Sequence, residues 1–322
     1  MIRAARRVSI AITLALCLVG LALVIWSAER LVEGVVGTSV GFGVSAFVVS
    51  VVFVGFDPEN LAVGAVGAVQ GLPGIAAGSV IGAAMVAVGL AFGVTALLAP
   101  MQFAQAPRRV LLVPVMAVLL FSALAIDGIL SRVDGGVLVV AFALAVFELL
   151  RLSRRGLDIR PTGEVAESLE RGSRPSRARA LGLLALSLTG LVVGSELLVA
   201  GSERVLAHLD LSETVYGMTL LALAVSVEEL ARELPAARRG RPDITVGNVA
   251  GSILAFFLCN AGLIALLHPV RIDPSVIRFF LPVLWLTVAF VTGCLATLRV
   301  PRWAGGVLVA LYLVFFVGAY VG

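Results

Sequence analysis

Acidic and amide side chains interrupt an apolar stretch of the sequence at residues 51–66, VVFVGFDPENLAVGAV. Asp57, Glu59 and Asn60 lie here among valine, phenylalanine, glycine, leucine and alanine. A carboxylate in hydrocarbon is costly and normally marks a path for ions or protons. A hard cation that loses its water needs several oxygen ligands, with carboxylates to neutralise its charge. These residue types therefore predict a site that binds a cation or a proton.

A second polar group lies in the later stretch AVSVEELARELPAARRGRPDITVGNVAGS, residues 224–252. Here Ser226 and Glu229 are three residues apart, a spacing that places a hydroxyl and a carboxylate on one face of a helix. Two such helices that cross antiparallel would bring four oxygen-bearing groups to one point. Glycine or proline beside the acids permits local unwinding, which frees backbone carbonyl groups as further ligands.

The elements that carry these residues follow from composition. The chain has 322 residues, 60% hydrophobic and 14% charged, and its mean hydropathy is +1.09. A soluble domain is only about 45–50% apolar, so we expect an integral membrane protein. The segments 57–70 and 226–237 are expected to extend its helices or break them. Apolar windows long enough to cross a ~30 Å hydrocarbon core predict ten spans, near residues 8–26, 35–56, 74–98, 109–127, 135–150, 180–200, 212–231, 244–267, 276–296 and 303–321.

Arginine positions predict the orientation in the membrane. Arginines gather in QAPRR, in RRGR at 238–241, in LRVPR and above all in the loop 151–179. By the positive-inside rule these loops face the cytoplasm, which with ten spans requires both termini to lie outside. The opposing signal is MIRAARR at the N-terminus. We therefore expect a multi-pass protein of the inner (plasma) membrane, with 151–179 as a cytoplasmic linker.

The chain repeats itself at a distance of 169 residues. Residues 55–93 align without a gap on residues 224–262, and glycine, proline and glutamate stay in register, as in Glu59 with Glu228 and Pro73 with Pro242. The copies begin five predicted spans apart, and an odd number of crossings reverses the second copy. The predicted fold class is an all-α membrane protein of about ten transmembrane helices, built as two inverted-topology five-helix repeats. Their expected bounds are 1–150 and 180–322.

The second copy resembles the alpha-repeat of the calcium/cation antiporter superfamily, which includes the sodium/calcium exchangers. That repeat reads roughly GTSxPE, then a spacer, then GNxxGSN, and here AVSVEE at 224–229 precedes GNVAGS at 247–252. AIDGILSRVDG at 125–135 is similar to the family's linker between its fourth and fifth helices. The resemblance covers nearly the whole chain. It implies a secondary-active antiporter that moves a cation, Ca²⁺ or another divalent ion, against Na⁺ or H⁺ by alternating access.

The first copy departs from the family pattern. The register places the motif glutamate on Asn60, its threonine on Phe56, its serine on Asp57 and its proline on Glu59. The resemblance thus implies a rewritten first half-site, in which Asp57 lies three residues before the motif position. Four polar positions of the family on the neighbouring helices correspond here to Ala83, Ala87, Ser252 and Phe256.

The expected cation ligands share an oxygen-bearing side chain and a place in one of the two repeats. Two carboxylates neutralise a divalent ion, so Asp57 and Glu229 are expected as its paired acids, with amide and hydroxyl residues as neutral oxygens. The repeat aligns Glu59 with Glu228. These two glutamates are expected as a second acidic pair that is peripheral or handles protons. The full set is Asp57, Asn60, Ser226, Glu229, Ser252, Glu59 and Glu228.

Structural roles compete with these assignments. Asp57 before Pro58 is typical of a helix N-cap or a turn, Glu229 can pair with Arg232 three residues on, and Asn248 can cap a helix after a glycine. For function, one alternative is a divergent relative that carries only protons or another substrate. Another is a sensor or partner protein that no longer transports. An intramembrane aspartyl protease is disfavoured because the sequence has no GxGD.

The sequence predicts a transporter and no enzyme activity. The three cysteines show no metal-ligand spacing, and no cofactor is expected beyond the transported cations, such as Ca²⁺, Na⁺ or H⁺. The expected partners are these cations and the lipid bilayer, and no nucleic acid.

Overall fold

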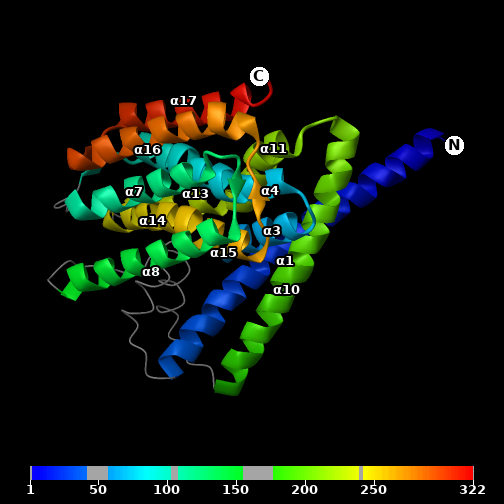
Figure 1. The fold of residues 1–322 in the computed structure, drawn as a ribbon, viewed down its shortest axis with the longest axis horizontal. Coiled ribbons are helices and arrows are strands. Elements are labelled where there is room, and N and C mark those ends of the chain that lie inside the picture. The colour runs from blue at the N-terminus through cyan, green and yellow to red at the C-terminus, as the bar shows by residue number, and fades with distance from the viewer. Residues whose placement is uncertain (1, 42–56, 103–107, 155–176, 239–241, 322) are drawn as a thin grey trace.

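A computed structural model describes residues 2–41, 57–102, 108–154, 177–238 and 242–321, and these ranges are almost entirely helical (Figure 1). The earlier helices are α1 (Ile2–Gly41), α3 (Pro58–Val69), α4 (Pro73–Ala77), η1 (Gly78–Gly82), α5 (Ala83–Met85), η2 (Val86–Ala91), α6 (Phe92–Leu98), α7 (Arg108–Ala125) and α8 (Arg132–Arg154). The later helices are α10 (Arg177–Leu209), α11 (Glu213–Tyr216), η3 (Gly217–Leu221), α12 (Ala222–Ser226), α13 (Glu228–Arg238), α14 (Pro242–Leu254), η4 (Ala255–Asn260), α15 (Ala261–Leu267), η5 (Val276–Phe280), α16 (Leu281–Ala296) and α17 (Arg302–Gly318). The η segments are π-helical turns within longer helices.

The length and hydropathy of the helices confirm a multi-pass membrane protein. In the described ranges, seven helical segments are long and apolar enough to cross a membrane, and α7 and α17 contain shorter apolar helices. The predicted span at 35–56 falls mostly outside these ranges. Two predicted boundaries are wrong, because α1 continues to Gly41 instead of ending near 26, and α10 continues to Leu209. The polar segment 29–34 stays helical in α1, where Arg30 donates to Glu33 at 2.7 Å within the helix.

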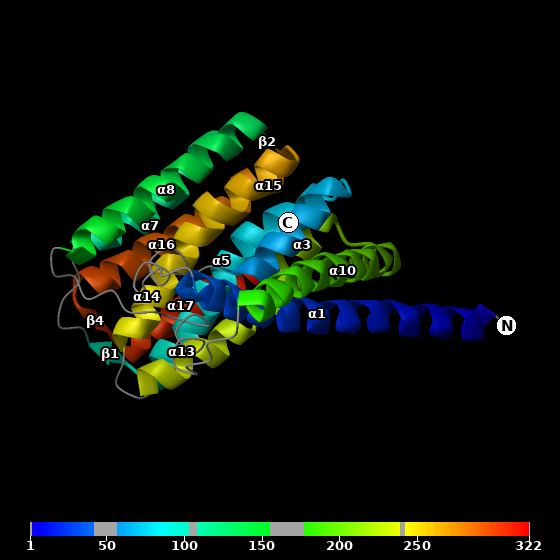
Figure 2. The same ribbon diagram turned by 90° about the horizontal axis from the view of Figure 1, so that it is seen from below.

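Burial separates central helices from peripheral ones. Other helices bury 83% of the apolar window in 73–98 and 78% of that in 247–267, but only 17% of the window in α8. On α8, Leu144 and Phe147 are each 64% exposed. Lipid tails are as apolar as such side chains, so this face of α8 suits contact with the bilayer. Figure 2 shows α8 along the edge of the bundle, beside α15.

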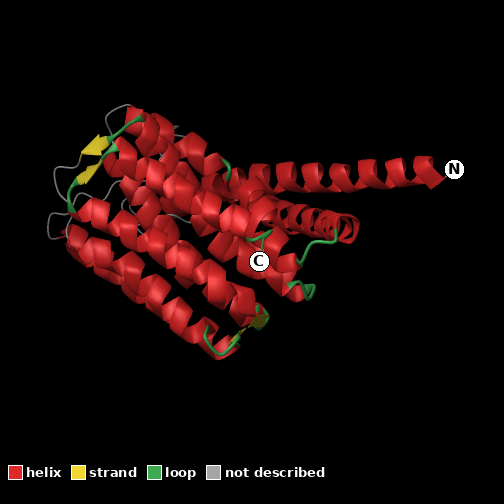
Figure 3. Ribbon diagram, turned by 90° about the horizontal axis from the view of Figure 1, so that it is seen from above, coloured by secondary structure: helices red, strands yellow, loops and turns green. Residues whose placement is uncertain are grey.

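Two short antiparallel ribbons join the earlier and later halves at opposite ends of the bundle (Figure 3). Strand β1 (Met101–Gln102) pairs with β4 (Arg299–Val300), and β2 (Ile129–Leu130) pairs with β3 (Val270–Arg271). The helices exchange partners in the same way, since α6 packs on α17 and α8 packs on α15. Strands β1 and β3 begin 169 residues apart, and so do the π-helical turns η2 and η4. Each half therefore contributes equivalent elements to the other.

The turn before α8 shows how the sequence fixes one end of the bundle. Gly128 has φ +87°, a conformation that a residue without a Cβ adopts at little cost. Its carbonyl accepts from the Ile272 amide at 2.9 Å. Ser131 and Asp134 then form reciprocal caps, because the Ser131 hydroxyl accepts from the Asp134 amide while the Asp134 carboxylate accepts from the Ser131 amide. The segment AIDGILSRVDG thus ends one helix and starts the next.

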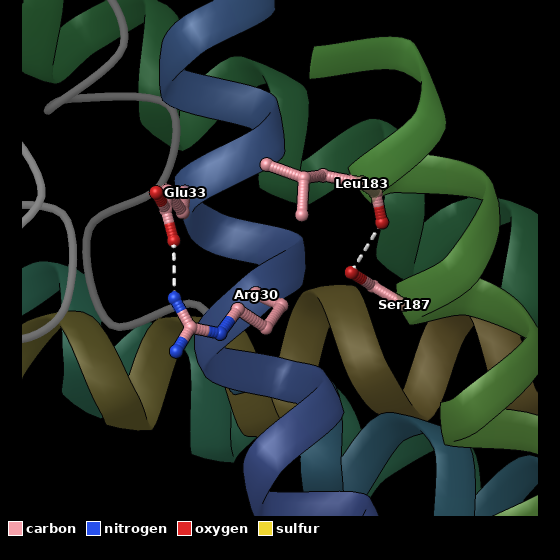
Figure 4. Close-up of polar contacts among 4 residues, drawn as sticks. All are labelled: Arg30, Glu33, Leu183 and Ser187. Atoms are coloured by element: carbon pink, nitrogen blue, oxygen red, sulfur yellow. Dashed lines mark hydrogen bonds and ion pairs between the residues drawn. The ribbon is translucent and has the colours of Figure 1, made fainter. Parts of the chain in front are cut away.

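Helices α1 and α10 lie side by side and run diagonally to the remaining helices (Figure 1). Their contact depends on glycine. A Cβ on Gly20 would lie 2.5 Å from the Leu198 amide nitrogen, and one on Gly194 would lie 2.9 Å from that of Val24. The polar groups drawn in Figure 4 bond within their own helix, Arg30 to Glu33 on α1 and Ser187 to the Leu183 carbonyl on α10. Close backbone packing through small residues is a typical way to join membrane helices.

The Gly20→Ala substitution is expected to destabilise this helix pair, because the added methyl group meets backbone atoms that cannot rotate away. Overpacking of this kind costs about 1–3 kcal/mol. Thermal unfolding of the purified protein in detergent measures the effect. The control is Gly182→Ala on α10, where a Cβ meets nothing within 4 Å. Equal melting temperatures for the two variants would contradict the packing described here.

Candidate cation site

Asp57 lies at the N-terminus of α3 and caps it. Its backbone is not helical (φ −128°, ψ 88°), and its Oδ1 accepts from the Asn60 amide at 2.8 Å. The Asn60 side chain adds a second bond from Nδ2 to Asp57 Oδ2 at 2.9 Å. Asp57 is 2% exposed. The helix-cap role predicted from the Asp-Pro pair is therefore confirmed, and it holds a carboxylate inside the helical bundle.

A helix interruption lies opposite this cap. Helix α12 ends at Ser226 and α13 begins at Glu228, with Val227 between them. Asn60 Nδ2 also donates to Ser226 Oγ at 3.0 Å, so one amide bridges the start of α3 and this interruption. At the 169-residue distance, Asp57 corresponds to Ser226 and Asn60 to Glu229. The start of α3 and the break between α12 and α13 thus lie at equivalent positions of the repeat, and Asn60 joins them.

Asn260 is a member of this group that the sequence analysis missed. It is the last residue of η4, is fully buried, and donates from Nδ2 to the Asp57 carbonyl at 3.2 Å. The 169-residue repeat aligns Asn260 with Ala91, so comparison of the two copies gives no indication of a polar residue at this position. The available signal was a single amide in the apolar run AFFLCNAGLIALL. Such an amide requires a polar partner when it is buried.

Two amide oxygens in this group lack partners. Asn60 Oδ1 and Asn260 Oδ1 are buried and accept no hydrogen bond from the part of the chain that the structure describes. Most buried polar atoms in proteins do have a partner, so each exception calls for an explanation. Together with the Asp57 carboxylate and the Ser226 hydroxyl, these oxygens form a set of hard ligands of the kind that Na⁺ and Ca²⁺ prefer. We define Asp57, Asn60, Ser226 and Asn260 as the junction site.

Glu229 belongs to a second hydrogen-bonded group. It is 2% exposed on α13, and its Oε2 accepts from Asn248 Nδ2 on α14 at 2.8 Å. Asn248 lies within α14, so the prediction that it caps a helix is wrong. The Arg232 side chain, the competing partner proposed for Glu229, is outside the described part of the structure. The predicted paired acids, Asp57 and Glu229, thus belong to two separate hydrogen-bonded groups, on α3 and on α13.

The remaining predicted ligands lie nearby in the sequence but differ in burial. Glu59 is 1% exposed in the first turn of α3, and Glu228 is half-buried in the first turn of α13. A carboxylate in the first turn of a helix interacts favourably with the helix dipole. Ser252 is buried on α14. Within the described ranges, no three His, Cys, Asp or Glu side chains cluster as metal ligands, so any cation site here depends on amide and hydroxyl oxygens as well.

The positions where polar family residues are replaced are packed into the core. Ala83, Ala87 and Phe256 are all fully buried members of one hydrophobic cluster. Phe56 lies outside the described residues. The apolar side chains at these positions therefore offer no oxygen ligands in the core of the bundle.

A cavity of about 820 Å³ opens at the end of the bundle that carries β2 and β3. Its lining includes the carboxylates of Glu203, Glu213 and Asp273 and the guanidinium of Arg271. An excess of negative charge in a cleft raises the local concentration of cations.

The chain is similar to known membrane proteins over most of its length. The sequence matches the family described as "Sodium/calcium exchanger protein" over residues 12–150 and 179–321. An uncharacterized membrane protein of Methanocaldococcus jannaschii is 29% identical over 302 residues, which cover 92% of this chain and 94% of that protein. The inner membrane protein YrbG of Escherichia coli is 28% identical over 267 residues, 81% of each chain.

A solved structure is similar over the same length. It is the sodium-calcium exchanger NCX_Mj, soaked with 10 mM Na⁺ and zero Ca²⁺, with a TM-score of 0.60 and 26% identity. The match covers 95% of this chain and 98% of that one. The likeness therefore includes both halves of the chain.

Two substitutions of Asp57 separate its cap from its charge. Asparagine is as good an N-cap as aspartate, whereas alanine loses about 0.5–2 kcal/mol. Asp57→Asn is therefore expected to melt close to the wild-type temperature in detergent, and Asp57→Ala several degrees lower. If Asp57→Asn melts as low as Asp57→Ala, then the charge, and not the cap bond to Asn60, stabilises α3.

Proposed function

The chain belongs to the sodium/calcium exchanger family, and we propose that it is a secondary-active cation antiporter that moves Ca²⁺ or another divalent ion against Na⁺ or H⁺. The observation that carries this proposal is the junction site. A buried carboxylate, a hydroxyl and two amide oxygens without partners lie where the start of α3 meets the break between α12 and α13. Transporters commonly bind their ions at interrupted helices near the membrane midplane.

The chemistry at the junction is an exchange of ligands. A cation that enters loses water and gains protein oxygens, and the Asp57 carboxylate supplies the charge that a neutral set lacks. Asn60 positions the ligands, because its amide links Asp57 to Ser226 and so fixes the distance between the start of α3 and the end of α12. Glu229 supplies the second carboxylate that a divalent ion requires, and Ser252 a further oxygen. Glu59 and Glu228 form the peripheral or proton-handling pair.

Alternating access follows from the proposed architecture. In our proposal residues 1–150 and 180–322 are five-helix repeats of inverted topology, joined by the cytoplasmic linker 151–179, with both termini outside. The exchange of strands and helices between the halves supports this arrangement, since β1 with β4 mirrors β3 with β2. The cavity lined by Glu203, Glu213 and Asp273 then lies at the outer end, away from the arginine-rich loops, and gathers cations before they enter.

A second candidate function rests on the apolar replacements. Phe256 and Ala87 are fully buried where the family resemblance implies oxygen ligands. Loss of those ligands favours fewer ion positions and simpler coupling, with protons alone in one direction. In the extreme case the chain no longer transports and acts as a sensor or partner protein.

Flux measurements in proteoliposomes decide between these functions. Purified protein is reconstituted with Ca²⁺ outside, and a Na⁺ gradient or a pH gradient is imposed in separate runs. We expect Ca²⁺ uptake that depends on one of the gradients and falls at least tenfold in Glu229→Gln, because the substitution removes a buried charge but keeps the shape. Asp57→Asn is expected to change the ion preference.

The control is Glu29→Gln, the same change at an exposed position on α1, which should transport like the wild type. Normal Ca²⁺ flux in both Glu229→Gln and Asp57→Asn would contradict the site assignment. The absence of flux with Ca²⁺, Mn²⁺ or Mg²⁺ under either gradient would overturn the antiporter proposal in favour of the second candidate.

A further inference from the structure

A groove lies between α16 and α17, two helices that pack side by side along one edge of the bundle (Figure 1). Its volume is about 830 Å³, and none of its lining residues belongs to the junction site. The side chains that line it are apolar except those of Thr297 and Arg299. Both of these lie where α16 ends and the chain turns toward α17. The groove is therefore apolar along its length and polar at one end.

Small residues on α16 leave the groove open. Ala289 and Gly293 are one helical turn apart and both are exposed, and a Cβ on Gly293 would meet nothing within 4 Å. Trp303 and Val307, one turn apart on α17, form the opposite wall. The Phe290 ring of α16 contacts the Trp303 ring edge-on, with centroids 6.0 Å apart, and so joins the two walls. The hollow thus results from the two small side chains between larger ones.

The groove is about as long as one leaflet of a bilayer. Its lining runs from Leu286 to Thr297 on α16 and from Trp303 to Leu311 on α17. At ~1.5 Å per residue these stretches span ~16 Å and ~12 Å. Half of the ~30 Å hydrocarbon core is ~15 Å. An acyl chain of one leaflet therefore matches the groove in length and in polarity.

Two arginines lie at the polar end. The Arg299 backbone pairs with Gln102 across the β4–β1 ribbon, and Arg302 is the first residue of α17. Both arginines are exposed, and neither guanidinium has an acidic partner in the part of the chain that the structure describes. A guanidinium presents a planar fork of N–H donors that matches a phosphate group. Trp303, 64% exposed next to Arg302, is a residue type enriched at the headgroup level of membranes.

We propose that this groove binds an anionic phospholipid, such as phosphatidylglycerol, with one acyl chain between α16 and α17 and the phosphate at Arg299. The arginines favour an anionic headgroup over a neutral one. The hollow at Gly293 distinguishes such a retained lipid from the bulk lipid that contacts other faces of the bundle. By the positive-inside rule this end faces the cytoplasm, where the leaflet is rich in anionic lipid. The inference rests on the location of the chain in a membrane and not on its transport function.

Thermal unfolding of the delipidated full chain in detergent tests the proposal. Added phosphatidylglycerol is expected to raise the melting temperature by several degrees, because a ligand that binds only the folded state stabilises it. Phosphatidylcholine with the same acyl chains, and inorganic phosphate at the same concentration, should each give less than a third of that shift. An equal shift with phosphatidylcholine would show that charge is not recognised, and an equal shift with phosphate would show that the groove is not used. Either result would overturn the proposal.

Two variants test the two ends of the groove separately. Arg299→Gln removes the charge and Gly293→Leu fills the hollow, and each is expected to reduce the shift with phosphatidylglycerol at least threefold. The matched controls are Arg278→Gln, at an exposed arginine before the other end of α16, and Gly182→Leu, at an exposed glycine of α10 whose Cβ meets nothing within 4 Å. Both controls should respond like the wild type.

Melting without lipid establishes that each variant is folded. A wild-type shift in folded Arg299→Gln or in folded Gly293→Leu would overturn the proposal. So would a change from dimer to monomer in Gly293→Leu, because the groove would then be an interface between two copies of the chain. Loss of gradient-driven flux has no bearing on this test, since lipid binding is measured on the folded protein without a gradient.

Discussion

The hydrogen bond from Asn60 to Ser226 joins the capped start of α3 to the break between α12 and α13 inside an apolar bundle, and the arrangement of the surrounding polar groups depends on it. An interrupted helix leaves backbone groups that hydrocarbon cannot satisfy. Asp57 satisfies one end by capping α3, and Asn260 satisfies the Asp57 carbonyl from a third helix. The polar groups that hold this cap are thus the same groups that we propose as cation ligands. Structural and functional roles of Asp57 are therefore not alternatives.

Packing at small residues brings these groups together. Gly78 and Gly217 meet backbone to backbone, since a Cβ on either would lie within 2.4 Å of the other helix. Gly82 likewise approaches Met218 and Ala222. Such contacts fix the spacing of the central helices, while α1 and α10 form their own glycine-mediated pair (Figure 1). Larger side chains in place of these glycines would move the central helices apart and so separate Asn60 from Ser226.

The parts of this arrangement that the repeat encodes could be predicted from the sequence. The register aligned Asp57 with Ser226 and the Asp-Pro pair predicted the cap, whereas the sequence left open whether the segments 57–70 and 226–237 extend or break their helices. Asn260 could not be found in this way, because its counterpart is Ala91 and a search for self-similarity favours positions that match. The length of α1 was missed for a different reason. The apolar window near residues 8–26 marked only the hydrophobic part of the helix, whereas the helix continues through Arg30 and Glu33, which form an ion pair within it.

The most direct test of the account is to locate the ion. Crystals of the full chain grown in Ca²⁺, with data collected where calcium scatters anomalously, would give a difference peak for each bound ion. The account predicts a peak at the junction, with oxygens of Asp57 and Asn60 at about 2.3–2.6 Å. A structure in which the junction residues are ordered and calcium is bound elsewhere, with no calcium peak at the junction, would contradict this prediction.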